Sequence, residues 1–153
     1  DPTPLSFPLL DARMNGAKCK LLLDLASRDG RTELLQKVAG ADILVTSARA
    51  RGLAGLGLTV ETVFAVNPAL IWVAITAHGW ASARVGFGDD AAAAGGLVQW
   101  SGQQPDFLGD ALADPLTGVL AARAVMQMLE GGQAGLVDVA LAHSAGHAAA
   151  MLA

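Results

Sequence analysis

The sequence has little cysteine and little positive charge, and each shortage excludes a class of protein. The single cysteine, Cys19, cannot form an internal disulfide, and we expect no secretion signal, which together indicate the reducing cytoplasm. Ten lysines and arginines stand against 14 acidic residues, and they are scattered along the chain. A net charge of −4 leaves no electrostatic footprint for nucleic acid, so nucleic-acid binding is not expected.

Long apolar runs are also missing. Asp114, Arg123 and Asp138 interrupt the longest candidates before they reach the roughly 18 residues of a membrane span, so no association with a membrane is expected. Hydrophobic residues nevertheless make up 53% of the sequence and charged residues only 16%, which is more apolar than an ordinary soluble monomer needs. We therefore expect part of the surface to be covered by missing chain or by a partner, such as a second copy.

Several common functional motifs are absent as well. Gly55-Leu56-Gly57 and Gly86-Phe87-Gly88 are completed neither to a dinucleotide fingerprint nor to a phosphate loop. No serine stands in a Gly-X-Ser-X-Gly elbow. His143 and His147 lie four residues apart on a predicted helix, but no third ligand accompanies them, so we predict no metal site.

What the sequence does contain is an alternation of short apolar runs with helical stretches, which predicts one α/β unit with a mainly parallel sheet flanked by helices. Strands are predicted at residues 21–25, 42–46, 70–75 and 136–141, the first three of them as apolar, buried runs. Helices are predicted at 31–38, 59–66, 90–97 and 116–129, and from residue 144 onward. Residues 78–88, rich in glycine, and 103–105 are predicted as loops.

Three positions stand out as candidates for chemistry. Asp114 precedes a proline at the start of a long apolar helix, and since Pro115 suits a first helical turn, Asp114 is predicted to be the N-cap. Capping alone would account for it. His78 follows a predicted strand at the usual ligand edge of an α/β sheet, although a lone loop histidine is more often merely solvated. Asp89 and Asp90 open a predicted helix, where capping explains them about as well as catalysis.

Seven segments, in this order, resemble the class III coenzyme A transferases, a group that also contains the α-methylacyl-CoA racemases. They are NGAK (15–18), LDL (23–25), ADILV (41–45), LAGLGL (53–58), VNPALI (66–71), ADPLTG (113–118) and VDV (137–139). The resemblance covers nearly the whole chain. It implies that residues 1–153 are the central part of a Rossmann-like CoA-binding domain, and that the partner is a second copy in an interlocked homodimer.

The resemblance also implies site residues and a reaction. CoA would bind near the strand ends and the loop after the second predicted strand, at Thr46, Ser47, Arg49, Arg51 and His78; only Arg49 matches the basic residue of the usual family loop. The substrates would be an acyl-CoA and a carboxylic acid, with no metal.

Asp114 matches the family's catalytic aspartate, which attacks the thioester to form an acyl-aspartyl anhydride. Where the racemases carry a Gly-His-Asp segment, this chain has Gly88-Asp89-Asp90, which favours CoA transfer between carboxylic acids. Two alternatives remain open. One is an isomerase that uses Asp89 or Asp90 as its second base, and the other is a non-catalytic subunit that binds CoA or a partner.

Overall fold

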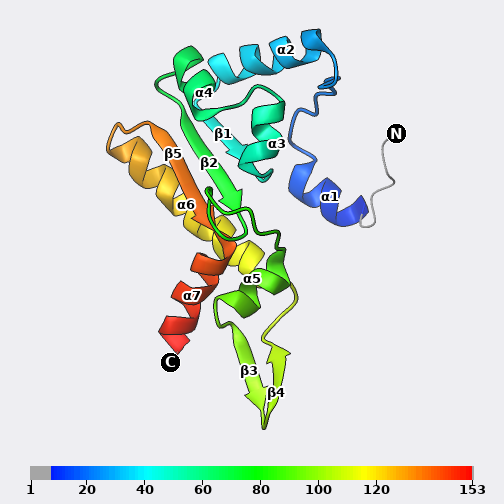
Figure 1. Cartoon of the computed structure of the whole chain (residues 1–153), viewed down its shortest axis with the longest axis vertical. Helices are drawn as coiled ribbons and strands as arrows, with labels where there is room; N and C mark the ends of the chain where they lie inside the picture. Colours follow the sequence, from blue (N-terminus) through cyan, green and yellow to red (C-terminus); the bar gives the residue numbers. More distant parts are fainter. Residues whose placement is uncertain (1–7, 153) are drawn as a thin grey trace.

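The computed structural model describes residues 8–152 and places them in an α/β fold (Figure 1). A parallel sheet has the order β1-β2-β5, and a separate antiparallel hairpin pairs β3 with β4. In chain order the elements are α1 (Pro8–Asn15), α2 (Arg28–Ala39), β1 (Ile43–Thr46), α3 (Ala50–Gly55), α4 (Val60–Val66), β2 (Ile71–Thr76), α5 (Gly88–Ala94), β3 (Val98–Ser101), β4 (Gln104–Phe107), α6 (Ala113–Glu130), β5 (Gly135–Ala140) and α7 (Leu141–Leu152).

The central strand β2 is buried because helices cover it on both faces. Trp72 points to one face, where it packs with apolar side chains of α2, α3 and α4. Ile71 and Val73 point to the other face, where α6 covers them through Ala121. This alternation is the period of a strand, and it produces the layered arrangement visible in Figure 1. The predicted fold class, a mainly parallel sheet flanked by helices, is confirmed.

The predicted strand at residues 21–25 is wrong. The chain there has no regular structure, and Leu22 is 99% exposed. An extended run becomes a strand only when a neighbouring strand accepts its hydrogen bonds, and no strand within residues 8–152 pairs with this segment. The predicted burial of the next strand is also wrong, because β1 lies at the sheet edge with Val45 63% exposed.

Residues 103–105 were predicted as a loop, yet Gln104 and Pro105 begin strand β4. Gly102, with φ +68°, provides the tight turn that joins β3 to β4. Proline is compatible with a strand here because each strand of a two-stranded hairpin is an edge. Figure 1 shows this hairpin projecting beyond α5 and α7, at the opposite end of the molecule from α2.

Capping residues set several helix ends. The Ser27 hydroxyl accepts a hydrogen bond from the Gly30 amide at 3.0 Å and starts α2. The Thr59 hydroxyl accepts from the Thr62 amide at 3.2 Å and starts α4. Gly131 ends α6. The helix predicted at 90–97 instead begins at Gly88 and ends at residue 94.

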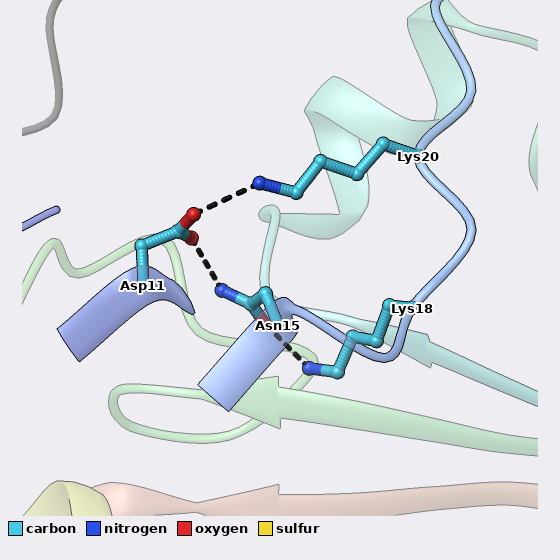
Figure 2. Close-up of polar contacts among 4 residues, drawn as sticks. All are labelled: Asp11, Asn15, Lys18 and Lys20. Atoms are coloured by element: carbon cyan, nitrogen blue, oxygen red, sulfur yellow. Dashed lines mark hydrogen bonds and ion pairs between the residues drawn. The ribbon is translucent and has the colours of Figure 1, made fainter. Parts of the chain in front are cut away.

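Helix α1 buries none of its residues and is held by polar contacts to the segment that follows it (Figure 2). The Lys20 ammonium lies 2.8 Å from the Asp11 carboxylate, and the Asn15 amide donates to the same carboxylate at 2.6 Å. The Lys18 ammonium in turn donates to Asn15 at 2.6 Å. The hydrogen bonds from Lys20 and Asn15 lower the pKa of Asp11 below its usual value.

Candidate functional site

A cleft of about 460 Å³ opens beyond the carboxyl ends of β1 and β2. Because these strands are parallel, their carboxyl ends meet at one edge of the sheet, where ligands of open α/β sheets usually bind. Two segments form its walls. One is residues 47–52 after β1, and the other is the end of β2 with the loop that follows it, within residues 75–87.

The lining of the cleft is basic and partly aromatic. It contains Arg49, Arg51 and Arg84 but no aspartate or glutamate, although the whole chain has a net charge of −4. Trp80 and Phe87 add aromatic surface. The cleft therefore concentrates positive potential, which favours a ligand with several negative charges and an apolar part.

Four of the five residues predicted to bind the cofactor lie together in this lining, namely Ser47, Arg49, Arg51 and His78. Thr46, the fifth, lies outside it. Its hydroxyl accepts a hydrogen bond from the indole nitrogen of Trp72 at 2.9 Å, which ties β1 to the core.

Asp138 of β5 holds the loop that carries His78. One carboxylate oxygen accepts from the Thr76 hydroxyl at 2.7 Å, and the other accepts from the Trp80 amide at 2.5 Å. The Thr76 hydroxyl also accepts from the amide of Gly79, at 3.0 Å, and Gly79 has φ +102°, which favours glycine. Sequence reasoning assigned Asp138 no role, although a carboxylate within an apolar strand was a usable signal.

The predicted N-cap role of Asp114 is wrong. Helix α6 begins at Ala113, so Asp114 lies within its first turn as an exposed residue, and Leu112 occupies the cap position without a side-chain hydrogen bond. The Asp114 amide donates to the Ala111 carbonyl at 2.9 Å, which starts the helix earlier than the proline suggests. Pro115 is tolerated because the first amides of a helix lack intrahelical acceptors.

The Asp114 carboxylate packs directly against Gly88, the first residue of α5. A Cβ at Gly88 would overlap with the carboxylate oxygen Oδ2 of Asp114. The His78 ring packs against the other glycine of the Gly86-Phe87-Gly88 segment, since its Nε2 lies 2.9 Å from where a Cβ of Gly86 would be. Phe87 between them lines the cleft. Asp114 is therefore outside the cleft lining, and it contacts the glycine that directly follows the lining residues Gly86 and Phe87.

The acidic pair at the start of α5 contacts backbone amides. Asp89 Oδ1 accepts from the Ala111 amide at 2.8 Å, and Asp90 Oδ2 accepts from the Phe87 amide at 3.3 Å. Capping therefore describes Asp90, whereas Asp89 bridges to the loop before α6.

Within the described part of the chain, no cluster of three or more histidine, cysteine or acidic side chains has a geometry that could hold a metal ion. His143 and His147 both lie on α7, as predicted. None of the helices between residues 8 and 152 is long and apolar enough to cross a membrane.

Comparisons with known proteins show the family and the fold to which the chain is similar. The model of CoA-transferase family III matches residues 9–153. Succinate–glutarate CoA-transferase of Agrobacterium fabrum is 30% identical, with 83% of this chain covered. Rv3272 of Mycobacterium tuberculosis has a similar solved structure, with a TM-score of 0.76 and 26% identity over 85% of this chain. A CaiB/BaiF family protein of Brucella suis has a TM-score of 0.70 and 27% identity over 82%.

The chain spans about a third of the length of the curated relative, 34%, and 39% and 36% of the two solved chains. The match of the family model over nearly all of the sequence identifies this chain as a member of CoA-transferase family III.

Proposed function

We propose that the chain binds the CoA part of an acyl-CoA in the cleft, and that Asp114 is the nucleophile in CoA transfer between carboxylic acids. The observation that carries this proposal is the basic, acid-free cleft at the carboxyl edge of the sheet, with the Asp114 carboxylate against Gly88 beside its rim. The relative named a succinate–glutarate CoA-transferase supports the same reaction class. Residues 1–153 would then form the central part of a Rossmann-like CoA-binding domain.

Binding rests on charge and shape. CoA carries several phosphate charges, and arginine guanidinium groups bind phosphates in bidentate fashion. Arg49, the N-cap of α3, and Arg51, in the first turn of α3, line the cleft on the side of β1, and Arg84 lines it after β2, so cations line the cleft from two segments. Trp80 and Phe87 offer apolar surface to the rest of the ligand.

The proposed reaction has two stages. The Asp114 carboxylate attacks the thioester carbonyl carbon, the carbon–sulfur bond breaks, and CoA leaves as a thiolate, which gives an acyl-aspartyl anhydride. In the second stage an incoming carboxylate attacks the Asp114 carboxyl carbon of this anhydride and displaces the donor acid, which leaves the acceptor acyl group on Asp114. CoA thiolate then attacks the acceptor acyl carbon, which releases the new acyl-CoA and the free Asp114 carboxylate. Gly88, the first residue of α5, contacts Asp114, and its amide has no intrahelical acceptor, so we propose this amide as a donor to the oxyanion that forms during attack.

The double variant Arg49→Ala and Arg51→Ala is expected to weaken CoA binding by about tenfold or more, because hydrogen bonds to charged groups each contribute about 1.5–3 kcal/mol. Isothermal titration calorimetry with CoA and the intact protein measures this change. The matched control is Arg28→Ala with Arg123→Ala, which removes the same charge from exposed helical positions outside the cleft lining. Equal affinities of the two double variants would contradict binding in the cleft.

We also propose that the protein assembles as a homodimer. Ile43 and Val45 of β1 are exposed on the sheet face that α6 covers over β2 and β5. On α6 itself, Val119 and Met126 lie seven residues apart and are 70% and 56% exposed. Exposed apolar side chains on a sheet edge and on the neighbouring helix are surface that an interface would cover.

The hairpin adds a second apolar surface. Its register pairs Val98 with Phe107 and Trp100 with Pro105, which places these four side chains on one face. Trp100 is 65% exposed, and an isolated two-stranded hairpin is marginally stable in water.

Light scattering of the purified protein is expected to give twice the mass of one chain. The Val45→Glu variant should shift that mass toward the monomer, since it places a charge on the apolar face of β1. Met151→Glu, at an exposed position near the end of α7, is the control and should leave the mass unchanged. A wild-type mass equal to one chain would contradict assembly.

A further inference from the structure

The loop that leads into Asp114 contains a strained residue. Ala111 has φ +46°, in the left-handed region that residues other than glycine rarely adopt. Among positions 8–152 it is the one residue other than glycine with a positive φ. Strain of this kind persists only where the surroundings hold it in place. Ala111 lies three residues before the proposed nucleophile, Asp114.

Asp89 supplies the hydrogen bond that holds this residue. Its Oδ1 atom accepts from the Ala111 amide at 2.8 Å, across 22 residues of sequence. The Ala111 carbonyl in turn accepts from the Asp114 amide at 2.9 Å. The neighbour of Asp89, Gly88, packs against the Asp114 carboxylate. The first two residues of α5 therefore contact both the loop that fixes the Asp114 backbone and the Asp114 side chain.

We propose that Asp89 is a positioning residue for Asp114, acting as the acceptor of the Ala111 amide and not as a proton-transferring base. This inference rests on the proposed function of Asp114. Because the role needs only an oxygen acceptor at Oδ1, asparagine can perform it, whereas a base must be able to gain a proton. The two roles thus give opposite results for Asp89→Asn.

Asp90 provides a matched control within the same turn. Its carboxylate accepts from the amide of Phe87, the N-cap of the same helix, at 3.3 Å, whereas the Ala111 amide donates to Asp89. Asp90→Ala removes the same charge and the same number of atoms as Asp89→Ala.

The experiment compares wild type, Asp89→Ala, Asp89→Asn and Asp90→Ala in the intact protein. With an acyl-CoA donor and a carboxylic acid acceptor, Asp89→Ala is expected to lower kcat by about 100-fold with little change in KM for the acyl-CoA, because a displacement of about 1 Å at a nucleophile costs that much. Asp89→Asn should recover activity to within a few-fold of wild type. Asp90→Ala, which removes a capping acceptor of α5 but leaves the hydrogen bond to Ala111, should lower kcat much less than Asp89→Ala.

Amide hydrogen exchange gives a readout that does not depend on turnover. The Ala111 amide should exchange at least tenfold faster in Asp89→Ala than in wild type, with Asp89→Asn close to wild type and the amides of β2 unchanged in both. Unaltered exchange at Ala111 in Asp89→Ala would overturn the inference.

The activity measurements distinguish failure of this inference from failure of the proposed function on which it rests. If Asp89→Asn is as inactive as Asp89→Ala while the Ala111 amide exchanges at the wild-type rate, catalysis needs the charge of Asp89 or a base at that position. That result also overturns the inference. A wild type that forms no acyl-enzyme trappable by hydroxylamine would overturn the proposed function instead, and the exchange measurement would still decide whether Asp89 holds Ala111.

Discussion

Replacing Asp114 by asparagine is expected to lower CoA transfer by about three orders of magnitude or more while leaving the fold intact. Asparagine has nearly the same shape, so it fits against Gly88, but its amide cannot form the acyl-aspartyl anhydride. The cost in stability should be small, because Asp114 is exposed and makes no cap hydrogen bond. Only its favourable interaction with the helix dipole, about 0.3–1 kcal/mol, is lost.

Steady-state turnover and trapping of the acyl-enzyme with hydroxylamine measure the effect, and a thermal melt checks the fold. The control is Asp110→Asn, which removes an exposed carboxylate from the same loop and should transfer CoA at the wild-type rate. CoA transfer by Asp114→Asn at close to the wild-type rate would mean that another group attacks the thioester.

The start of α6 could not be predicted from local sequence rules. Local rules place an aspartate before a proline at the N-cap, and the α6 helix itself was predicted. The actual start depends on Ala111, whose backbone is held by Asp89 from a different helix. A contact between residues 22 positions apart leaves no periodic pattern in the sequence, so neither the position of the cap nor the role of Asp89 could be predicted.

Strand predictions succeeded where burial is local and failed where a partner is required. Strand β2 was predicted well, because a β-branched and aromatic run covered on both faces is distinctive. The apolar run at residues 21–25 has the same appearance but no neighbouring strand within the described residues. The β3–β4 hairpin was missed because glutamine and proline obscure its alternation, although Gly102 marks its turn.

The location of the cleft could be predicted in part from the sequence. The loop after β1 and His78 were placed correctly at one sheet edge, because parallel strands bring their carboxyl ends together. Trp80 and Arg84 were not identified. They lie in the glycine-rich loop, whose path is fixed by Asp138 from the opposite edge of the sheet. Side chains on such a loop can be placed only once the long-range hydrogen bonds are known.

Gly95→Ala is expected to have the largest effect on stability. Gly95, the C-cap of the alanine-rich helix α5, meets α7. A Cβ at Gly95 would lie 2.5 Å from the Ala142 carbonyl oxygen and 2.6 Å from the Gly146 amide nitrogen. Both atoms are backbone, so relief requires α7 to move as a whole rather than one side chain to rotate.

The φ of Gly95 is −85°, which alanine adopts freely. The loss of folding stability in Gly95→Ala should therefore be steric alone, about 3 kcal/mol or more. Chemical denaturation measures it, and the melting temperature should fall by roughly 8 °C. Gly118→Ala on α6 is the control, because nothing beyond its chain neighbours and its own helix backbone lies within 4 Å of its Cβ position. Alanine there should stabilise the helix by about 0.5–1 kcal/mol. Equal shifts in the two variants would mean that α5 and α7 do not pack backbone to backbone. Because α5 also carries Gly88 and Asp89, a shift of its packing should reach Asp114 and lower turnover in the folded fraction of Gly95→Ala.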